Sequence, residues 1–191
     1  TFKYFLRYYL PLALTSLVGI IRRPLGSAAL FRMPLPLESA AAAPAWRGVV
    51  DLLFALSLSF VEVVVFGLKE PNARTSLWKF CLILSGTVIL VLSAVVLTPL
   101  SDFVLITLLH LPPELTELVR LSLLLSIPVP ALGVLQAFYQ GEILVSGRTR
   151  LITEAMMITV VVLVLGLLFG IAAENFPGLY LLSVANCLSV L

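Results

Sequence analysis

Two adjacent arginines, Arg22 and Arg23, lie inside the apolar stretch "SLVGIIRRPLGSAAL" and are followed by Pro24. A charge at the centre of a bilayer costs between about 2.5 and more than 10 kcal/mol, so such residues usually face a cavity or a partner. The guanidinium fork suits carboxylate or phosphate groups, and a proline leaves a carbonyl oxygen free. One interpretation is therefore an anion-attracting point in a water-filled cavity. The other is a helix that breaks at Arg23, with the arginines in a shallow crevice or paired with acids of the next span.

The next apolar stretch supplies two acids. From Asp51 to Glu62 is eleven residues, or three helical turns with about 20° left over, so both carboxylates share one stripe of a helix. Glu62 has apolar neighbours in "SFVEVVVFGL", which makes it a candidate for proton or cation coupling. The alternative is a counter-ion for Arg22 or Arg23, or a side chain that reaches the membrane interface. The same two roles, coupling to a proton or cation and balancing the charge of the arginines, are open for Asp51.

A later span contains the prolines of "SIPVPALG", Pro128 and Pro130. Each removes a backbone donor and so interrupts the hydrogen-bond ladder of a helix. Together with Pro24 they are candidate hinges.

Gln136, Tyr139 and Gln140 follow these prolines at spacings of three and four residues. That spacing places all three on one helical face. A proline kink alone is usually a packing feature, but a kink followed by a polar stripe favours the lining of a cavity. The three residues are therefore candidate substrate-binding residues, alongside the two arginines.

Residues for other chemistries are few. His110 is the single histidine, so neither a histidine metal site nor a Ser/His catalytic arrangement is supported, and we expect no enzyme activity, metal or cofactor. Cys81 and Cys187 fall in apolar segments far apart in the sequence, which predicts buried, unpaired thiols. A net charge of +2 without a basic run excludes nucleic acid as a partner.

The amino-acid composition indicates whether the protein is surrounded by water or by lipid. Of the 191 residues, 61% are hydrophobic and 12% are charged, and the mean hydropathy is +1.15, whereas a soluble domain is about one quarter charged. This predicts an all-α integral membrane protein. Because a bilayer-spanning helix needs about 20 apolar residues, the chain divides into a single bundle of six transmembrane helices, with "MPLPLESAAAAP" as a connector. The predicted spans are residues 8–33, 47–68, 78–98, 115–140, 150–172 and 178–191, the last one truncated.

Lysines and arginines are concentrated before the first span, after the second and after the fourth, and the alternate connections hold few. Because cytoplasmic loops carry the excess of these residues, a multi-pass protein of the plasma or inner membrane is predicted, with its amino terminus in the cytoplasm. The cations that carry this prediction are Lys3, Arg7, Lys69, Arg74, Lys79, Arg148 and Arg150.

Two local patterns in the fifth predicted span predict specific contacts. Arg150 and Glu154 stand four residues apart and are expected to form an ion pair near the membrane interface. "GLLFG" in the fifth span has the spacing of small residues that lets membrane helices approach closely.

Several segments resemble those of a known family. "FLRYYLPLALTSLVGIIRRPLGSAAL" is similar to the start of the second half of transporters in the multidrug/oligosaccharidyl-lipid/polysaccharide flippase superfamily, which includes the MATE exporters. "SIPVPALGVLQAFYQG" and "LVSGRTRLITEA" strengthen the likeness, which is greatest for the branch of the progressive ankylosis protein and its bacterial relatives.

The resemblance implies a twelve-helix transporter that alternates between inward and outward access. This chain would be its carboxy-terminal lobe and the amino-terminal lobe its partner; because the chain begins at Thr1 and stops in an apolar run, we expect it to be part of a longer protein. The branch is associated with efflux of anions such as pyrophosphate, nucleotides or citrate, and Arg22 and Arg23 suit an anionic or amphipathic substrate better than a cationic drug. The alternative is a non-transporting membrane subunit of a larger complex.

Overall fold

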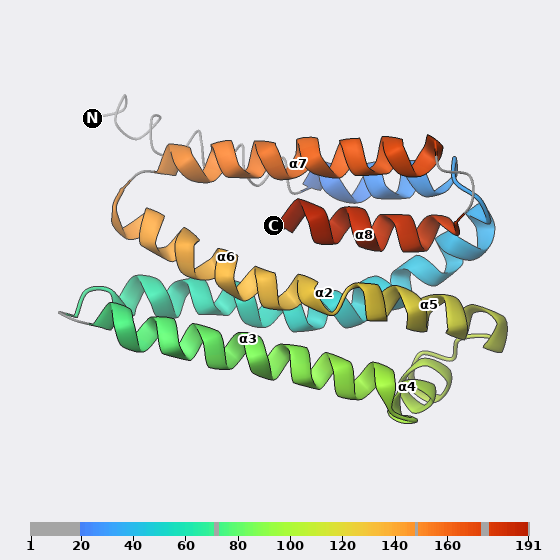
Figure 1. Ribbon diagram of the computed structural model, residues 1–191, viewed down its shortest axis with the longest axis horizontal. Coiled ribbons are helices and arrows are strands. Elements are labelled where there is room, and N and C mark those ends of the chain that lie inside the picture. Colours follow the sequence, from blue (N-terminus) through green and yellow to red (C-terminus); the bar gives the residue numbers. More distant parts are fainter. Residues whose placement is uncertain (1–19, 71–72, 148, 173–175, 191) are drawn as a thin grey trace.

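The computed structural model describes residues 20–70, 73–147, 149–172 and 176–190, and every regular element in these ranges is a helix (Figure 1). The all-helical prediction is therefore confirmed for this part of the chain. Residues 20–30 form the described part of a first helix. The elements that follow are α2 (Pro36–Gly67), α3 (Ala73–Leu97), α4 (Leu100–Asp102), the π-helical turn η1 (Phe103–Leu108), α5 (Pro113–Leu125), α6 (Pro128–Val145), α7 (Thr149–Ala172) and α8 (Gly178–Val190).

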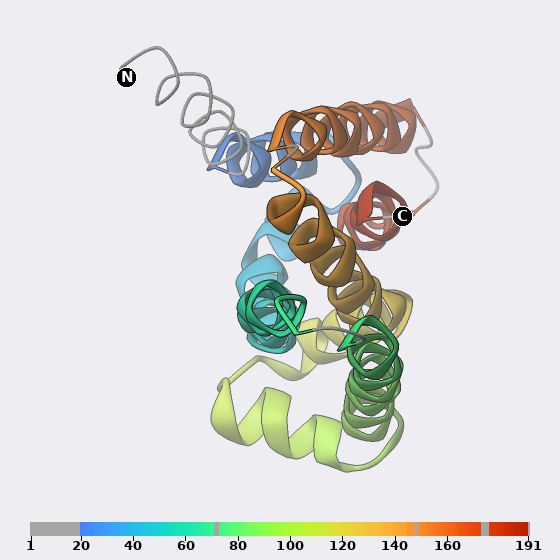
Figure 2. The ribbon, with the colours of Figure 1, turned by 90° about the vertical axis from the view of Figure 1, so that its left-hand side faces the viewer.

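Helix α6 is the element around which the others are arranged. It crosses between two groups of helices, with α2 and α3 on one side and α7, α8 and the helix of residues 20–30 on the other (Figures 1 and 2). Its most extensive contact is with α2, whereas α7 packs mainly on α8. The buried apolar side chains form two clusters, a large one that includes Trp46 and Leu179 and a smaller one around Phe60, Val64 and Phe138.

Buried hydroxyl groups hold α6 against α2 and α3. Ser57 of α2 donates a hydrogen bond to the carbonyl oxygen of Pro130 at 3.3 Å, and Ser85 of α3 donates to that of Ala131 at 3.4 Å. Small polar side chains are common at contacts between membrane helices, because they let the backbones approach and satisfy polar groups away from water. Two consecutive carbonyl oxygens of α6 thus accept hydrogen bonds, one from α2 and one from α3.

Helices α5 and α6 together match the predicted fourth span, but the break lies at residues 126–127. The Ser126 hydroxyl donates to the carbonyl oxygen of Ser122 at 2.8 Å and accepts from the indole N–H of Trp46 at 2.9 Å. Pro128 and Pro130 stand in the first turn of α6, where a missing backbone N–H costs no bond within the helix. The prolines therefore begin a helix, and the interruption precedes them.

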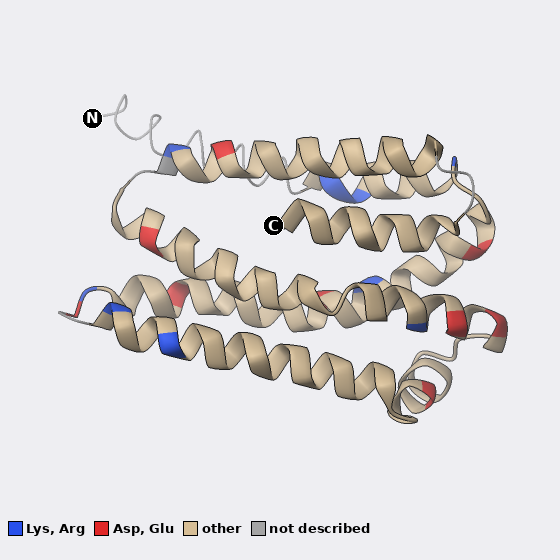
Figure 3. Ribbon diagram, viewed as in Figure 1, with Lys and Arg blue, Asp and Glu red and all other residues tan. Residues whose placement is uncertain are grey.

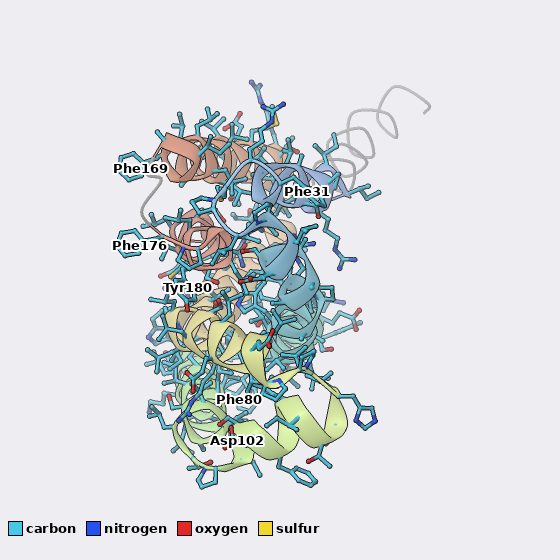
Figure 4. All side chains as sticks on the ribbon, turned by 90° about the vertical axis from the view of Figure 1, so that its right-hand side faces the viewer. Phe31, Phe80, Asp102, Phe169, Phe176 and Tyr180 are labelled. Carbon is cyan, nitrogen blue, oxygen red and sulfur yellow. The ribbon has the colours of Figure 1, made fainter. Side chains whose placement is uncertain are left out.

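Four helical segments in the described part of the chain are long and apolar enough to cross a membrane: α2, α3, α5 taken together with α6, and α7. Much of the apolar surface of these helices and of the turns that join the helices is exposed. Phe31, Phe169 and Phe176 are examples at one end of the bundle (Figure 4). Because soluble monomers rarely expose large contiguous apolar surface, these helices indicate a membrane-embedded protein.

The second helix begins earlier than predicted. Residues 33–44 are expected to form a connector, but α2 begins at Pro36 and continues through Pro44. The physical reason is that proline suits the first position of a helix and that the alanines which follow have the highest helix propensity. The chain enters α2 by a tight turn in which Leu35 has a left-handed φ of 53°. Arg47 consequently lies well inside the helix and not at its start.

Two of the six predicted spans are described only in part. The first is represented by residues 20–30, and residues 8–19 lie outside the described residues. The last is represented by α8, whose 13 residues are fewer than a full crossing needs. The count of six stays a prediction, and Lys3, Arg7 and Arg148 likewise lie outside the described residues.

Both local packing patterns are present. Arg150 Nε and Glu154 Oε1 are 2.9 Å apart, which confirms the predicted ion pair. The two glycines of "GLLFG" face α8, since a Cβ on Gly166 would stand 2.9 Å from the Cβ of Ala185, and one on Gly170 would also meet α8. The motif therefore serves the contact between α7 and α8.

Gly141 of α6 provides a test of the contact between α6 and α2. A Cβ at this position would stand 2.6 Å from Cγ1 and 2.8 Å from Cβ of Val64, a buried residue whose β-branched side chain has little freedom to move. We expect Gly141→Ala to destabilise the full-length protein by about 1–3 kcal/mol, measured by thermal unfolding in detergent. Gly86→Ala in α3 is the control, because a Cβ there meets nothing within 4 Å. Equal melting temperatures for the two variants would contradict this packing.

Candidate functional site

Most charged residues of the described chain lie towards the two ends of the bundle, but one group lies in its middle (Figure 3). This group, named here the central charge group, consists of Arg22 and Arg23 in the helix of residues 20–30 and of Arg47 and Asp51 in α2. Asp51 is the sixteenth of the 32 residues of α2, so it lies at the helix midpoint. Three positive charges and one negative charge thus meet far from either end of the bundle.

The central charge group lines a cavity of about 400 Å³ between the helix of residues 20–30, α2, α6, α7 and α8. The neutral polar groups of the cavity wall come from Gln136, Thr159 and Asn186, and most of the remaining wall is apolar. A concave, mainly apolar wall with a few converging polar groups is typical of a site for a small molecule.

The Arg22 guanidinium links the first described helix to α8. Its Nη2 donates to Oδ1 of Asn186 and to Oγ of Ser189, the second bond measuring 2.7 Å. Hydrogen bonds from a charged donor are stronger than those between neutral groups. Arg22 is therefore oriented by α8 and is half-buried.

The Arg23 guanidinium is held more loosely. Its Nη2 lies 3.6 Å from Oδ2 of Asp51, and the two side chains are 76% and 57% exposed. Exposed pairs of this kind contribute little stability. Arg47 precedes Asp51 by one turn of α2 and is half-buried, and its guanidinium forms no ion pair with a described carboxylate within 4 Å. Positive charge is therefore in excess at the cavity wall.

The polar stripe predicted on α6 lines an adjoining cavity of about 330 Å³. Gln136, Tyr139 and Gln140 all contribute to its wall. Gln136 and Met156 line both this cavity and the one beside the central charge group. The structure thus brings the three α6 residues and the two predicted arginines to one connected region.

One of the two interpretations of the arginine pair contains an error. Residues 20–30 form a continuous helix through Pro24, which is exposed, so the predicted break at Arg23 is wrong. The pairing with an acid of α2 is present, and the acid is Asp51. Glu62 is exposed three turns farther along α2 and is not among the residues that line either cavity.

Three residues of the site were missed by sequence reasoning. Arg47 is the first residue of its predicted span, because the segment before it has the proline-rich composition of a connector. Asn186 and Ser189 were overlooked in α8, although their spacing of three residues puts them on one face of an apolar helix. An asparagine in a membrane span is itself a sign of a hydrogen bond between helices.

The chemistry that these groups support is the binding of an anion by guanidinium and amide groups. Within the described ranges, no three His, Cys, Asp or Glu side chains are placed to hold a metal ion. Cys81 is a buried free thiol, as predicted, whereas Cys187 is free but only half-buried.

The different surroundings of the two adjacent arginines predict different effects on stability. Arg22→Gln removes two hydrogen bonds from a charged donor and is expected to lower the melting temperature of the full-length protein by about 4 °C or more. Arg23→Gln is the matched control, because its weak, exposed ion pair predicts a change within about 1–2 °C. Thermal unfolding in detergent measures both. A larger loss for Arg23→Gln than for Arg22→Gln would contradict the assignment.

A comparison of the chain with protein-family models, with curated proteins and with solved structures finds no match.

Proposed function

We propose that this chain is one lobe of a secondary active transporter that moves an anionic small molecule across the membrane by alternating access. The observation that carries the proposal is the central charge group, in which three arginines and one aspartate line a cavity at mid-height in an apolar bundle. Charges at that depth are costly and mark substrate pathways when they face a cavity. Because arginine binds carboxylate and phosphate groups in a bidentate manner, the substrate class is an organic or inorganic anion.

The exposed charges on the open side of the cavity are evidence that a second lobe faces this side. Arg23 and Asp51 are both mainly exposed, and a charged surface at this depth is not compatible with contact to lipid tails. An amino-terminal lobe that faces this side would enclose the charges in a shared water-filled cavity. Completion of the first and last helices then gives six spans in this lobe and twelve in the transporter.

The charges at the two ends support the proposed orientation. Lys69, Arg74 and Lys79 lie at or near the connection between α2 and α3, and Arg150 lies at the start of α7, at the same end of the bundle (Figure 1). Arg32, before α2, and Arg120, in α5, are the described cations towards the other end. Figure 3 shows how the charged residues are distributed along the bundle. Since cytoplasmic ends carry more lysine and arginine, the first end faces the cytoplasm of a plasma or inner membrane. On this proposal the amino terminus is cytoplasmic as well, because the predicted first span ends near Arg32, a cation of the opposite end.

The sequence resemblance supports the same substrate class. The "IIRRPLG" segment that resembles the flippase superfamily contributes two of the three cavity arginines. The progressive ankylosis branch is associated with anions, which agrees with the excess of positive charge in the cavity. On this proposal helices bend at Pro24 and at the turn of residues 126–127 that precedes Pro128 and Pro130 during the exchange of access.

Transport by the full-length protein in proteoliposomes tests the proposal. We expect uptake of at least one of pyrophosphate, citrate and ATP, and no uptake of the cation tetraphenylphosphonium. Arg23→Ala is expected to lower the initial rate of anion uptake about tenfold or more, because it removes a charge-assisted contact.

Arg32→Ala is the control, since Arg32 is exposed at the end of the bundle and does not line the cavity. Its rate of anion uptake should equal that of the wild type. Unchanged uptake of every anion by Arg23→Ala would overturn the role of Arg23. Absence of uptake by the wild type, together with stable co-purification of other chains, would favour a non-transporting subunit.

A further inference from the structure

Two cavities meet at Asp51. The cavity described above lies on one side, and a second cavity of about 510 Å³ lies on the other, bounded by Phe31 and Pro44 among others. Arg23, Arg47 and Asp51 line both cavities. These three side chains are therefore the partition between them.

A third cavity continues the series towards the opposite end. The cavity beside the central charge group shares Gln136, Met156 and Val190 with the cavity of the α6 polar stripe. The three cavities thus follow one another from the end near Phe31 to the end near Ile143. The partition at Asp51 is the charged boundary between the first two cavities of this series.

The two arginines of the partition come from different helices, and only Arg23 is paired with Asp51. Arg23 reaches it from the helix of residues 20–30 and forms the 3.6 Å ion pair. Arg47 extends from α2 towards that helix, since a Cβ on Gly26 would stand 3.0 Å from Nη2 of Arg47. Two guanidinium groups therefore lie beside one carboxylate.

Arg22 is not part of this arrangement. Its Nη2 donates to Asn186 and Ser189 of α8, so its orientation is fixed by the protein itself. The guanidinium groups available to a ligand at the partition are those of Arg23 and Arg47.

We propose that Asp51 is a built-in competitor for the transported anion. In the absence of substrate its carboxylate pairs with Arg23, at the place where a carboxylate or phosphate group of the substrate binds Arg23 and the neighbouring Arg47. The inference rests on the proposed function and adds how the site is regulated. Because an incoming anion and the Asp51 carboxylate repel each other, binding displaces Asp51 and opens the partition between the two cavities.

The strength of the existing pair suits such an exchange. A fully buried ion pair would be costly to break, since it would leave an unpaired buried charge. The Arg23–Asp51 pair is exposed and longer than a normal hydrogen bond, so an anion that binds both arginines can replace it. Neutral or cationic molecules offer no such replacement and leave the partition in place.

Substitution of Asp51 by asparagine tests the inference. Isothermal titration calorimetry of the purified full-length protein in detergent, with pyrophosphate, citrate and ATP as probes, gives the dissociation constants. Removing an exposed carboxylate that competes for an arginine is expected to tighten binding of the preferred anion about threefold to tenfold in Asp51→Asn. Asp51→Glu retains the competing charge and should bind within about twofold of the wild type.

Glu38→Gln is the matched control, because it neutralises an exposed carboxylate on the same helix that lines neither cavity. Its affinity should equal that of the wild type. If the wild type binds an anion and Asp51→Asn binds it equally or more weakly, the competitor role is overturned while the transport proposal stands. If neither protein binds any of the three anions, both proposals fail.

Discussion

The desolvation of arginine is the constraint on which the arrangement of this bundle depends. A guanidinium group cannot lie against lipid tails at mid-depth without a partner or water, and three of them lie in the middle of an apolar helical bundle. Each is accommodated differently: Arg22 by amide and hydroxyl groups of α8, Arg23 by an exposed ion pair to Asp51, and Arg47 by its position at the wall of two cavities. The cavities and the open side of the bundle follow from the need to keep these charges hydrated or paired.

The surrounding fold supplies a fixed frame for these charges. Helix α6 is held to α2 and α3 by hydroxyl-to-carbonyl bonds, and the contact of Trp46 with Ser126 joins α2 to the turn that precedes α6. Trp46 also lines the cavity next to Arg47. The buried side chain of Trp46 therefore connects the bend before Pro128 to the charged site. A change in the bend would move Trp46 and so alter the cavity wall.

The hydrophobic pattern was sufficient to predict the helical class, the membrane environment and the approximate extent of four long spans. It failed at residues 33–44, because three prolines suggested a connector where proline at a helix start and a run of alanines favour a longer α2. The same holds for the candidate site: local helical spacing could be predicted, but the contacts between helices could not. Helical spacing predicted that Gln136 and its neighbours share a face, but the choice of Asp51 over Glu62 as partner of Arg23 depends on how two helices are offset. That offset is a tertiary property without a signal in local spacing.

Access of water and anions to the cavity is the central claim, and cysteine labelling measures it most directly. Ala55 is exposed and lines the cavity beside Asp51. Ala55→Cys in full-length protein, with Cys81, Cys187 and every other native cysteine replaced by serine, presents a single reporter thiol at the site. The account predicts that a membrane-impermeant thiol reagent labels this position in proteoliposomes and that a bound anion such as pyrophosphate slows the labelling. A position that stays unlabelled, or that is labelled at the same rate whichever anion is present, would contradict it.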